Sequence, residues 1–539
     1  MVKSVQPSCT EDRLAEGVFS FEHDHHRPAR ELDALLGGKG AGLAEMTKTL
    51  QIPVPPGFTI GLGISQLYRD GGWPAGLDAV LADHLTELGN KLGRHLGDRA
   101  DPLLVSVRSG APVSMPGMLD TVLNLGLNDQ TVLGLAELAD DERFAWNSYR
   151  RFAEMFATIV RNIPAEAIPR AENTSSAEIA RENLANLRDV VIRESGEDIP
   201  QDPHIQLRET VEAVFRSWDS PRAVAYREHE NIDPNIGTAV SIQSMVFGNR
   251  GTDSGTGVVF TRDPNTGDPT LYGDYLPNAQ GEDVVAGIAH TMEISALSAS
   301  QPRVAEQLEA VLRKLEVHYR DMCDVEFTVE QGKLWVLQTR VGKRGARAAA
   351  RIAADMVEDP EIALTTAEAV ERVPNNLLDR AKQDCAASGH RKSDKDVIAT
   401  GLPASPGRVS GRLVLTAEAA VESEDDVILA RNETSPEDVM GMSASVGVLT
   451  TCGGLVSHAA VVARGWGIPA VVGAKELTVD DRGLFADGQV QVSPGQTVTI
   501  DGGTGEVWVG GMETDEATET DYPREIILLE QWRSELARE

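Results

Sequence analysis

The stretch VGVLTTCGGLVSHAAVVARG, residues 446–465, decides the local fold of the C-terminal part of this chain. Residues 446–451 are rich in β-branched side chains and predict a short strand, and the glycine pair that follows predicts a turn. The alanine-rich run after the turn predicts a helix, with Ser457 as its N-cap and His458 on its first turn.

The predicted position of His458 suits a histidine that accepts a phosphoryl group. Free backbone N–H groups and the positive end of a helix attract a phosphate there. The same positive end disfavours an imidazolium ion, so we expect the ring to stay neutral and nucleophilic. A buried or capping histidine after a glycine turn is the alternative for a Ser-His pair taken alone.

The composition is that of a soluble globular chain with several domains. The chain has 539 residues, of which 41% are hydrophobic and 25% are charged, and this length predicts two to four domains. Its net charge of −33 opposes binding to nucleic acid or to an anionic membrane. The four cysteines form no CxxC pair, and we find neither a long apolar run nor a signal peptide. We therefore expect a cytoplasmic protein in a reducing compartment.

Changes in composition divide the chain into four segments. In residues 1–344, glycine-rich turns alternate with strands and helices, and the pattern is helical between about 138 and 225, which predicts a large α/β or α+β unit. Residues 345–399 read as a helical connector, and their polar stretch 384–394 predicts a flexible hinge. Residues 400–511 predict a compact β-rich domain. Residues 512–539 form an acidic tail whose apolar residues recur at helical spacing, which predicts a docking helix or, less simply, a partner-binding one.

Two motifs near the N-terminus suit phosphate binding. Lys39 lies inside a glycine turn, residues 37–42, that opens a helix, so the backbone can approach a phosphate and the lysine adds a charge. Arg108 ends a strand, where a planar guanidinium can bind phosphate oxygens at two points. The glycine turn is neither a Walker A loop nor a Rossmann fingerprint, and a structural salt bridge is the alternative for the arginine.

Two further motifs suit a triphosphate and its metal ion. Residues 248–258 contain four glycines and predict a second loop, whose backbone N–H groups can cover a triphosphate. Residues 324–328 and 335–340 predict two strands joined by a tight turn at 330–333, and the alternation of a strand puts Asp324 and Glu326 on one face. Acidic and amide oxygens on paired strands suit Mg²⁺, and a polar edge strand is the alternative.

The run of residues 433–473 resembles the phosphohistidine domain of the pyruvate phosphate dikinase and phosphoenolpyruvate synthase family. The N-terminal motifs occur in the order of that family's ATP-grasp domain. The resemblance implies a multidomain α/β (α+β) fold, in which an ATP-grasp nucleotide-binding domain precedes a small swivelling β/α phosphohistidine domain. It also implies Mg²⁺ and ATP as cofactors.

The resemblance implies a role for each residue that matches a family motif. His458 falls on the phosphohistidine position, and Arg340 assists phosphoryl transfer. Lys39 and Arg108 contact the triphosphate, and Thr256 and Gly257 belong to its covering loop. The residues that hold nucleotide and metal are Asp324, Glu326 and Gln338, with Glu326 and Gln338 as the metal ligands.

The reaction implied for the family begins with attack of His458 Nε2 on the β-phosphorus of ATP. AMP departs, and the γ-phosphoryl group passes to phosphate or water, giving pyrophosphate or phosphate. In the family a barrel with the pyruvate and phosphoenolpyruvate site follows, whereas only residues 512–539 follow the histidine domain here. We therefore expect this chain to carry out only the ATP half-reaction, with pyruvate or another acceptor supplied by a separate protein.

Two departures from the family pattern lie close to the histidine. Val456 replaces a threonine that is a regulatory phosphorylation site in plants, and Cys452 replaces an arginine that binds phosphate. Two other functions stay open. Rifampin phosphotransferases also phosphorylate a small molecule, but they place a large substrate domain where this chain has only residues 345–399. A non-catalytic nucleotide sensor is the other alternative, and the oligomeric state is not predicted.

Overall fold

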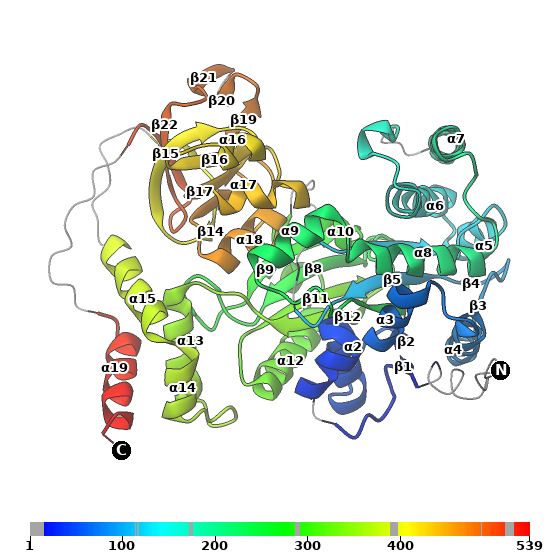
Figure 1. Ribbon diagram of the computed structural model, residues 1–539, viewed down its shortest axis with the longest axis horizontal. Coiled ribbons are helices and arrows are strands. Elements are labelled where there is room, and N and C mark those ends of the chain that lie inside the picture. The colour runs from blue at the N-terminus through cyan, green and yellow to red at the C-terminus, as the bar shows by residue number, and fades with distance from the viewer. Residues whose placement is uncertain are drawn as a thin grey trace, which may run out of the picture. The chain divides into compact units, whose positions relative to one another are not determined.

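The computed structural model describes residues 14, 16–27, 29–113, 115, 118–171, 176–285, 291–388, 397–486, 488–511 and 522–538 (Figure 1). The fold is mixed α/β. By its internal packing the chain divides into two compact units, Met1–Arg250 with Trp335–Gln338, and Gly251–Leu334 with Thr339–Glu539. The main boundary between these units follows Arg250, whereas the composition suggested a boundary at 344/345. The two boundaries differ because the strands after Gly251 pack with the helices that follow them.

The first unit is built on a five-stranded antiparallel sheet. In spatial order its strands are β1 (Val18–Ser20), β2 (Gly57–Ile60), β7 (Ala239–Ser244), β5 (Val105–Gly110) and β6 (Thr121–Leu125). Two short strands, β3 (His95–Leu96) and β4 (Pro102–Leu103), form a separate parallel pair.

Helices make up most of the rest of the first unit. They are α2 (Ala29–Ala44), α3 (Leu62–Gly71), α4 (Leu77–Leu92), α5 (Thr131–Ala139), α6 (Glu142–Met155), α7 (Ala177–Ser195), α8 (Pro203–Ser217) and α9 (Pro221–His229). Three short helical segments join them: Glu45–Thr49, Phe156–Val160 and Ala165–Ala167. The helical region expected near 138–225 is confirmed, and in α6 the side chains of Phe144, Tyr149 and Phe152 are buried in the core.

A second five-stranded sheet opens the second unit. Its order is β10 (Met292–Glu293), β9 (Tyr272–Pro277), β8 (Gly255–Phe260), β11 (Cys323–Glu330) and β12 (Lys333–Val341). Helices α10 (Gly281–Val285), α11 (Ser295–Ser300) and α12 (Pro302–Tyr319) accompany it. The tight turn expected between β11 and β12 is confirmed, with Gln331 at φ 49° and Gly332 at φ 73°.

Glycines inside β8 make room for aromatic rings from both neighbouring strands. A Cβ on Gly257 would lie 2.6 Å from Cζ of Phe327, and one on Gly255 would overlap the ring of Tyr275. These two rings are parallel, with centroids 6.4 Å apart. The prediction that Thr256 and Gly257 belong to a covering loop is therefore wrong, because both lie inside a paired strand.

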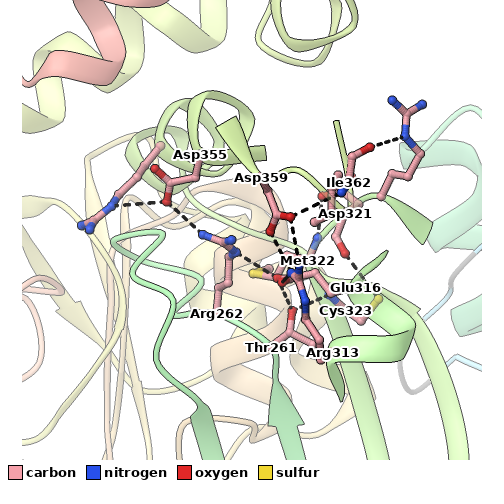
Figure 2. A network of polar contacts seen from close by, with 12 residues as sticks. Thr261, Arg262, Arg313, Glu316, Asp321, Met322, Cys323, Asp355, Asp359 and Ile362 are labelled. Atoms are coloured by element: carbon pink, nitrogen blue, oxygen red, sulfur yellow. Dashed lines mark hydrogen bonds and ion pairs between the residues drawn. The ribbon is translucent and has the colours of Figure 1, made fainter. Parts of the chain in front are cut away.

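Charged side chains connect the end of β8 with α12 and the next helix, α13 (Ala346–Glu358), as Figure 2 shows. Arg262 donates through Nε to Glu316 Oε1 at 2.9 Å and through Nη1 to Asp355 Oδ2 at 2.9 Å. Thr261 donates its hydroxyl to the same oxygen of Glu316 at 3.1 Å. Arg262 and Glu316 are 5% and 6% exposed, so this ion pair is a buried one.

Helices α13, α14 (Thr366–Arg372) and α15 (Asn375–Ser388) follow, and α19 (Arg524–Leu536) packs on them (Figure 1). Ile526 and Leu529 of α19 are buried in this helical cluster, so the docking helix expected from the sequence is confirmed. The stretch predicted to be flexible, 384–394, begins inside α15, where residues 384–388 are helical. Residues 389–394 lie outside the described part of the chain.

The C-terminal part of the second unit contains an eight-stranded sheet. Its order is β13 (Val397–Thr400), β23 (Glu506–Val509), β22 (Thr497–Asp501), β15 (Arg408–Val414), β16 (Val427–Arg431), β17 (Gly447–Thr450), β18 (Ala470–Val472) and β14 (Leu402–Ser405). A three-stranded sheet of β19 (Leu477–Asp480), β20 (Gly483–Ala486) and β21 (Gln489–Val492) accompanies it.

Three α-helices complete this part: α16 (Ala417–Val421), α17 (Val439–Ser443), which follows a short helical turn at Pro436–Asp438, and α18 (His458–Trp466). Strands β15 to β18 run parallel, and α18 makes the crossover from β17 to β18. The strand, turn and helix expected around His458 are therefore confirmed. No helix in the described ranges has the length and apolar content that crossing a membrane requires.

Candidate functional site

In the first unit, the glycine turn around Lys39 contacts the end of β5. Helix α2 breaks at Gly37, which has φ 67° and ψ 164°, and a Cβ there would overlap the carbonyl group of Gly110. The Gly38 N–H donates to the carbonyl oxygen of Ala111 at 3.0 Å. Lys39 lies close to the end of β5: a Cβ atom added to Gly110 would be 3.3 Å from the Cβ of Lys39. The first two predicted phosphate motifs thus meet at one corner of the sheet.

Arg108 and Gln338, two of the predicted nucleotide ligands, contact each other within the first unit. Arg108 donates through Nη1 to the Leu337 carbonyl oxygen at 3.2 Å and through Nη2 to Gln338 Oε1 at 3.3 Å. The arginine lies in the centre of β5, paired with Thr121 and Ser241 on either side. These hydrogen bonds to an amide and a carbonyl orient the guanidinium.

In the second unit, Asp324 and Arg340 form a close ion pair on β11 and β12. Arg340 Nε lies 2.7 Å from Asp324 Oδ2, and Asp324 is 4% exposed. Burial raises the pKa of Asp324 above its usual range, Arg340 opposes that shift, and Glu326 on the same strand adds to it. The pKa of Arg340 is raised by Asp324, so the guanidinium stays charged.

The other oxygen of Asp324, Oδ1, is buried and has no hydrogen-bond partner among the residues that the structure describes. Such an oxygen is costly to bury unless a cation or a proton satisfies it. Carboxylate oxygens of Asp324 and Glu326 are the hard donors that Mg²⁺ prefers. Among the residues that the structure describes, no three His, Cys, Asp or Glu side chains gather to hold a metal alone.

Thr256 and Gly257 are held within the sheet in this structure. The Thr256 hydroxyl donates to the Phe327 carbonyl oxygen at 3.0 Å, and the side chain is 2% exposed. The backbone of Gly257 pairs with Tyr275 on one side and Phe327 on the other. Of the predicted second glycine loop, residues 248–254 are the part that lies outside a strand.

His458 begins α18, and its two ring nitrogens have different surroundings. Nδ1 lies 3.0 Å from the hydroxyl oxygen of Thr434, whereas Nε2 is buried and has no hydrogen-bond partner among the described residues. Ser457 is the N-cap residue as predicted, but its side chain makes no capping hydrogen bond. When Nδ1–H donates to Thr434, the free lone pair of the ring lies on Nε2.

Burial lowers the pKa of His458 from its ordinary value of 6.5, against the opposing effect of Asp438 and Glu437. The ring is therefore neutral near pH 7, as the sequence predicted. The largest cause of the shift is loss of solvent contact. Nε2 is covered in this arrangement, so a phosphorus atom can reach it only after neighbouring groups move.

Thr434 is a site residue that the sequence analysis did not assign. It is 7% exposed and lies 24 residues before the histidine in a turn that a capping box fixes. In that box Asp438 Oδ2 accepts from the backbone N–H of Ser435 at 2.9 Å and from its hydroxyl at 3.3 Å. Residues 433–438 lie within the run that resembles the phosphohistidine domain. This motif was therefore the sequence signal that could have pointed to Thr434.

Comparison with known proteins gives two matching family models and a group of similar enzymes. The model described as pyruvate phosphate dikinase, AMP/ATP-binding domain, matches residues 63–302 and 289–361. The model described as PEP-utilising enzyme, mobile domain, matches residues 423–505.

The similar proteins are named as pyruvate, phosphate dikinases. Pyruvate, phosphate dikinase 1, chloroplastic, of Oryza sativa subsp. japonica is 46% identical over 511 residues, which are 92% of this chain and 53% of that protein. The enzyme of Rhizobium meliloti is 44% identical over 527 residues, 92% of this chain and 58% of its own length. That of Clostridium symbiosum is 44% identical over 524 residues, 94% of this chain and 59% of its own length. The chain thus spans somewhat more than half the length of these relatives.

Proposed function

Since the chain belongs to the pyruvate phosphate dikinase family, we propose that it uses ATP to phosphorylate its own His458 and releases AMP. We also propose that residues 1–344 form an ATP-grasp domain and residues 400–511 a swivelling phosphohistidine domain. Residues 345–399 would connect the two domains, and residues 512–539 would form the tail. The family models that match residues 63–361 and 423–505 support this assignment.

One observation carries the proposal: Nδ1 of His458 is engaged by Thr434, and Nε2 has no hydrogen-bond partner in the part of the chain that the structure describes. Burial lowers the pKa of the ring, which favours its neutral form. The lone pair of Nε2 attacks the β-phosphorus of ATP, and a new N–P bond forms. The bond from that phosphorus to the bridging oxygen of the α-phosphate breaks, and AMP leaves with the electron pair. The γ-phosphoryl group then passes to phosphate or to water.

The roles of the other residues follow from charge. Lys39, Arg108 and Arg340 would stabilise the negative charge that spreads over the phosphoryl oxygens in the transition state. The proposed metal ligands are Glu326 and Gln338. Mg²⁺, when bound, would supply Lewis-acid charge at the phosphates. Thr256 and Gly257 would contribute to ATP binding only through the backbone atoms of their strand.

The later fate of the phosphoryl group belongs to the same proposal. Relatives named pyruvate, phosphate dikinases suggest pyruvate as the acceptor. We propose that pyruvate, or another acceptor, then takes the phosphoryl group from the histidine. A cytoplasmic location and the absence of nucleic-acid and membrane partners stay predictions.

The test is a labelling experiment with the full chain. The protein is incubated with Mg²⁺, phosphate and ATP labelled at the β-phosphorus, and protein-bound label and AMP are measured. We expect acid-labile, base-stable label together with about one AMP per labelled site, as a phosphoramidate requires. ATP binding without label or AMP would contradict the proposal and favour the nucleotide sensor.

Replacing Thr434 with valine is expected to slow formation of phosphohistidine about 3- to 10-fold at saturating ATP, since one hydrogen bond that orients the ring is lost. Thr434→Ser, which keeps the hydroxyl, should restore most of the rate. Single-turnover labelling measures both rates. Thr478→Val, at an exposed position of β19, is the matched control and should behave as wild type. An unchanged rate for Thr434→Val would contradict a role in orienting the ring.

The rate of His458 labelling is expected to fall as the pH is lowered, with the midpoint of this fall (the acidic limb of the pH profile) below pH 6.5. Because burial lowers the pKa of His458, the ring stays neutral and reactive at pH values where an exposed histidine is already protonated. Glu437 favours the imidazolium form, so Glu437→Gln should move the limb to still lower pH. Labelling rates measured between pH 5 and 8 check both statements. A limb at or above pH 6.5 would contradict the burial argument.

A further inference from the structure

We infer that Asn432 is a positioning residue for phosphoryl transfer to His458: its side-chain amide joins the turn before the histidine, residues 451–457, to strand β19 and thereby holds Thr434 against the imidazole ring. These residues all lie in the second unit. The inference adds a positioning residue to the proposed function and rests on it.

The side-chain amide of Asn432 pairs with the backbone of Val479, on β19, at two points. Nδ2 donates to the Val479 carbonyl oxygen at 3.1 Å, and Oδ1 accepts from the Val479 N–H at 3.2 Å. Oδ1 also accepts from the hydroxyl of Thr451 at 2.9 Å. Because the pairing needs a donor and an acceptor on one planar group, an amide can make it and a carboxylate cannot.

Thr451 begins the turn that leads from β17 to α18, and its side chain is 5% exposed. A hydroxyl this deeply buried needs a hydrogen-bond acceptor, and Asn432 provides it. The Cys452 N–H donates to the Asn432 carbonyl oxygen at 2.8 Å, and the Thr450 hydroxyl donates to the Cys452 carbonyl oxygen at 2.7 Å. Both the backbone and the side chain of Asn432 therefore hold the start of the turn.

The segment that leads into β19 contacts the same turn directly. The Ala474 N–H donates to the Thr450 carbonyl oxygen at 3.0 Å. A Cβ on Gly473, which has φ 63°, would lie 2.6 Å from the carbonyl oxygen of Gly453. This separation leaves no room for a side chain, so the turn rests on the backbone of residues 473–474. Asn432 then joins the turn to the strand that follows this backbone.

These contacts have a consequence for the reaction. Asn432 lies two residues before Thr434, whose hydroxyl oxygen is 3.0 Å from Nδ1 of His458. The segment that supplies this hydroxyl and the turn that carries the ring therefore meet at Asn432. Two residues span at most about 7 Å, so a displacement of Asn432 also displaces Thr434. We expect loss of the amide to weaken the contact between Thr434 and the ring and to slow phosphorylation, without changing the affinity for ATP.

The test compares Asn432→Ala with wild type in the full chain by two measurements. In the first, amide hydrogen exchange at Val479 and in the peptide that contains residues 450–457 should become faster in the variant, on the order of 10-fold. In the second, the single-turnover rate of phosphohistidine formation at saturating ATP should fall about 3- to 10-fold, with an unchanged Kd for ATP. Asn376→Ala, at an exposed position of α15, is the matched control and should behave as wild type in both.

A second variant tests the contact from the turn. Thr451→Val keeps the shape of the side chain and removes the hydroxyl that Asn432 accepts from. It should accelerate exchange of the same peptide and slow phosphorylation about 2- to 5-fold. Thr451→Ser, which keeps the hydroxyl, should recover most of the rate.

A double variant separates positioning from a general loosening of the fold. If Asn432 acts through Thr434, Asn432→Ala combined with Thr434→Val should slow phosphorylation little more than Thr434→Val does alone. A general loss of structure would instead make the two effects multiply.

The two proposals fail in different ways. Wild-type exchange or a wild-type rate in Asn432→Ala would overturn the positioning role, as would multiplied effects in the double variant. Accelerated exchange in Asn432→Ala, in a chain whose wild type forms no phosphohistidine, would support the contact between the turn and β19 and overturn only the proposed function.

Discussion

Replacing His458 with asparagine is expected to abolish transfer of the β-phosphoryl group of ATP to the protein, a loss of at least about 10³-fold. Asparagine keeps a polar side chain of similar reach, but its amide nitrogen has no available lone pair and cannot attack phosphorus. The ring it replaces has one nitrogen engaged by Thr434 and one without a hydrogen-bond partner among the described residues, so the change removes the proposed nucleophile.

The measurement combines protein-bound label, AMP release and ATP binding. His458→Asn should bind ATP as wild type does while forming neither label nor AMP, because the proposed nucleotide ligands are untouched. His204→Asn, an exposed histidine at the start of α8, is the control and should be labelled normally. Acid-labile label on His458→Asn would identify a different acceptor and contradict the proposed function.

Truncating Glu316 to alanine is expected to lower the free energy of unfolding of the second unit by about 3–5 kcal/mol. Glu316 accepts from Thr261, Arg262 and Arg313, at 3.1, 2.9 and 3.3 Å. Its removal leaves the buried Arg262 paired with Asp355 alone among the described residues (Figure 2). The loss is large because a buried guanidinium then lacks a counter-charge on Nε.

Thermal unfolding of the full chain, followed by a signal from the second unit, measures this effect. Glu309→Ala removes an exposed glutamate from the same helix and should change the stability by no more than about 0.5 kcal/mol. Glu316→Gln keeps the shape and part of the hydrogen bonding, so its loss should fall between the two. A Glu316→Ala loss no larger than that of the control would contradict a structural role for this ion pair.

The parts of the fold that sequence reasoning predicted are those set by neighbours in the chain. The strand, glycine turn and helix around His458, the hairpin at Gln331–Gly332 and the docking helix α19 each depend on local propensity and spacing. The same is true of Asp324 and Glu326, whose shared face follows from the alternation of a strand.

The parts that were missed depend on residues far apart in the chain. Glycine at 255 and 257 looked like a loop, but these glycines accommodate Tyr275 and Phe327, which no local pattern shows. Thr434 reaches His458 over 24 residues, and Asn432 reaches Val479 over 47. Partners of this kind become visible only when the sheets are assembled.

The sharp turn at Gly37 limits how the nucleotide half of this protein can be engineered. The turn at Gly37 packs directly against Gly110, and the N–H of Gly38 donates a hydrogen bond to the carbonyl oxygen of Ala111. This corner of the sheet therefore has no room for an inserted linker, epitope or dye. Insertions there would separate the lysine from the strand of Arg108 before they disturbed anything else. Reporter groups for nucleotide occupancy are better attached on solvent-facing positions of α3 or α4, which leave this corner intact.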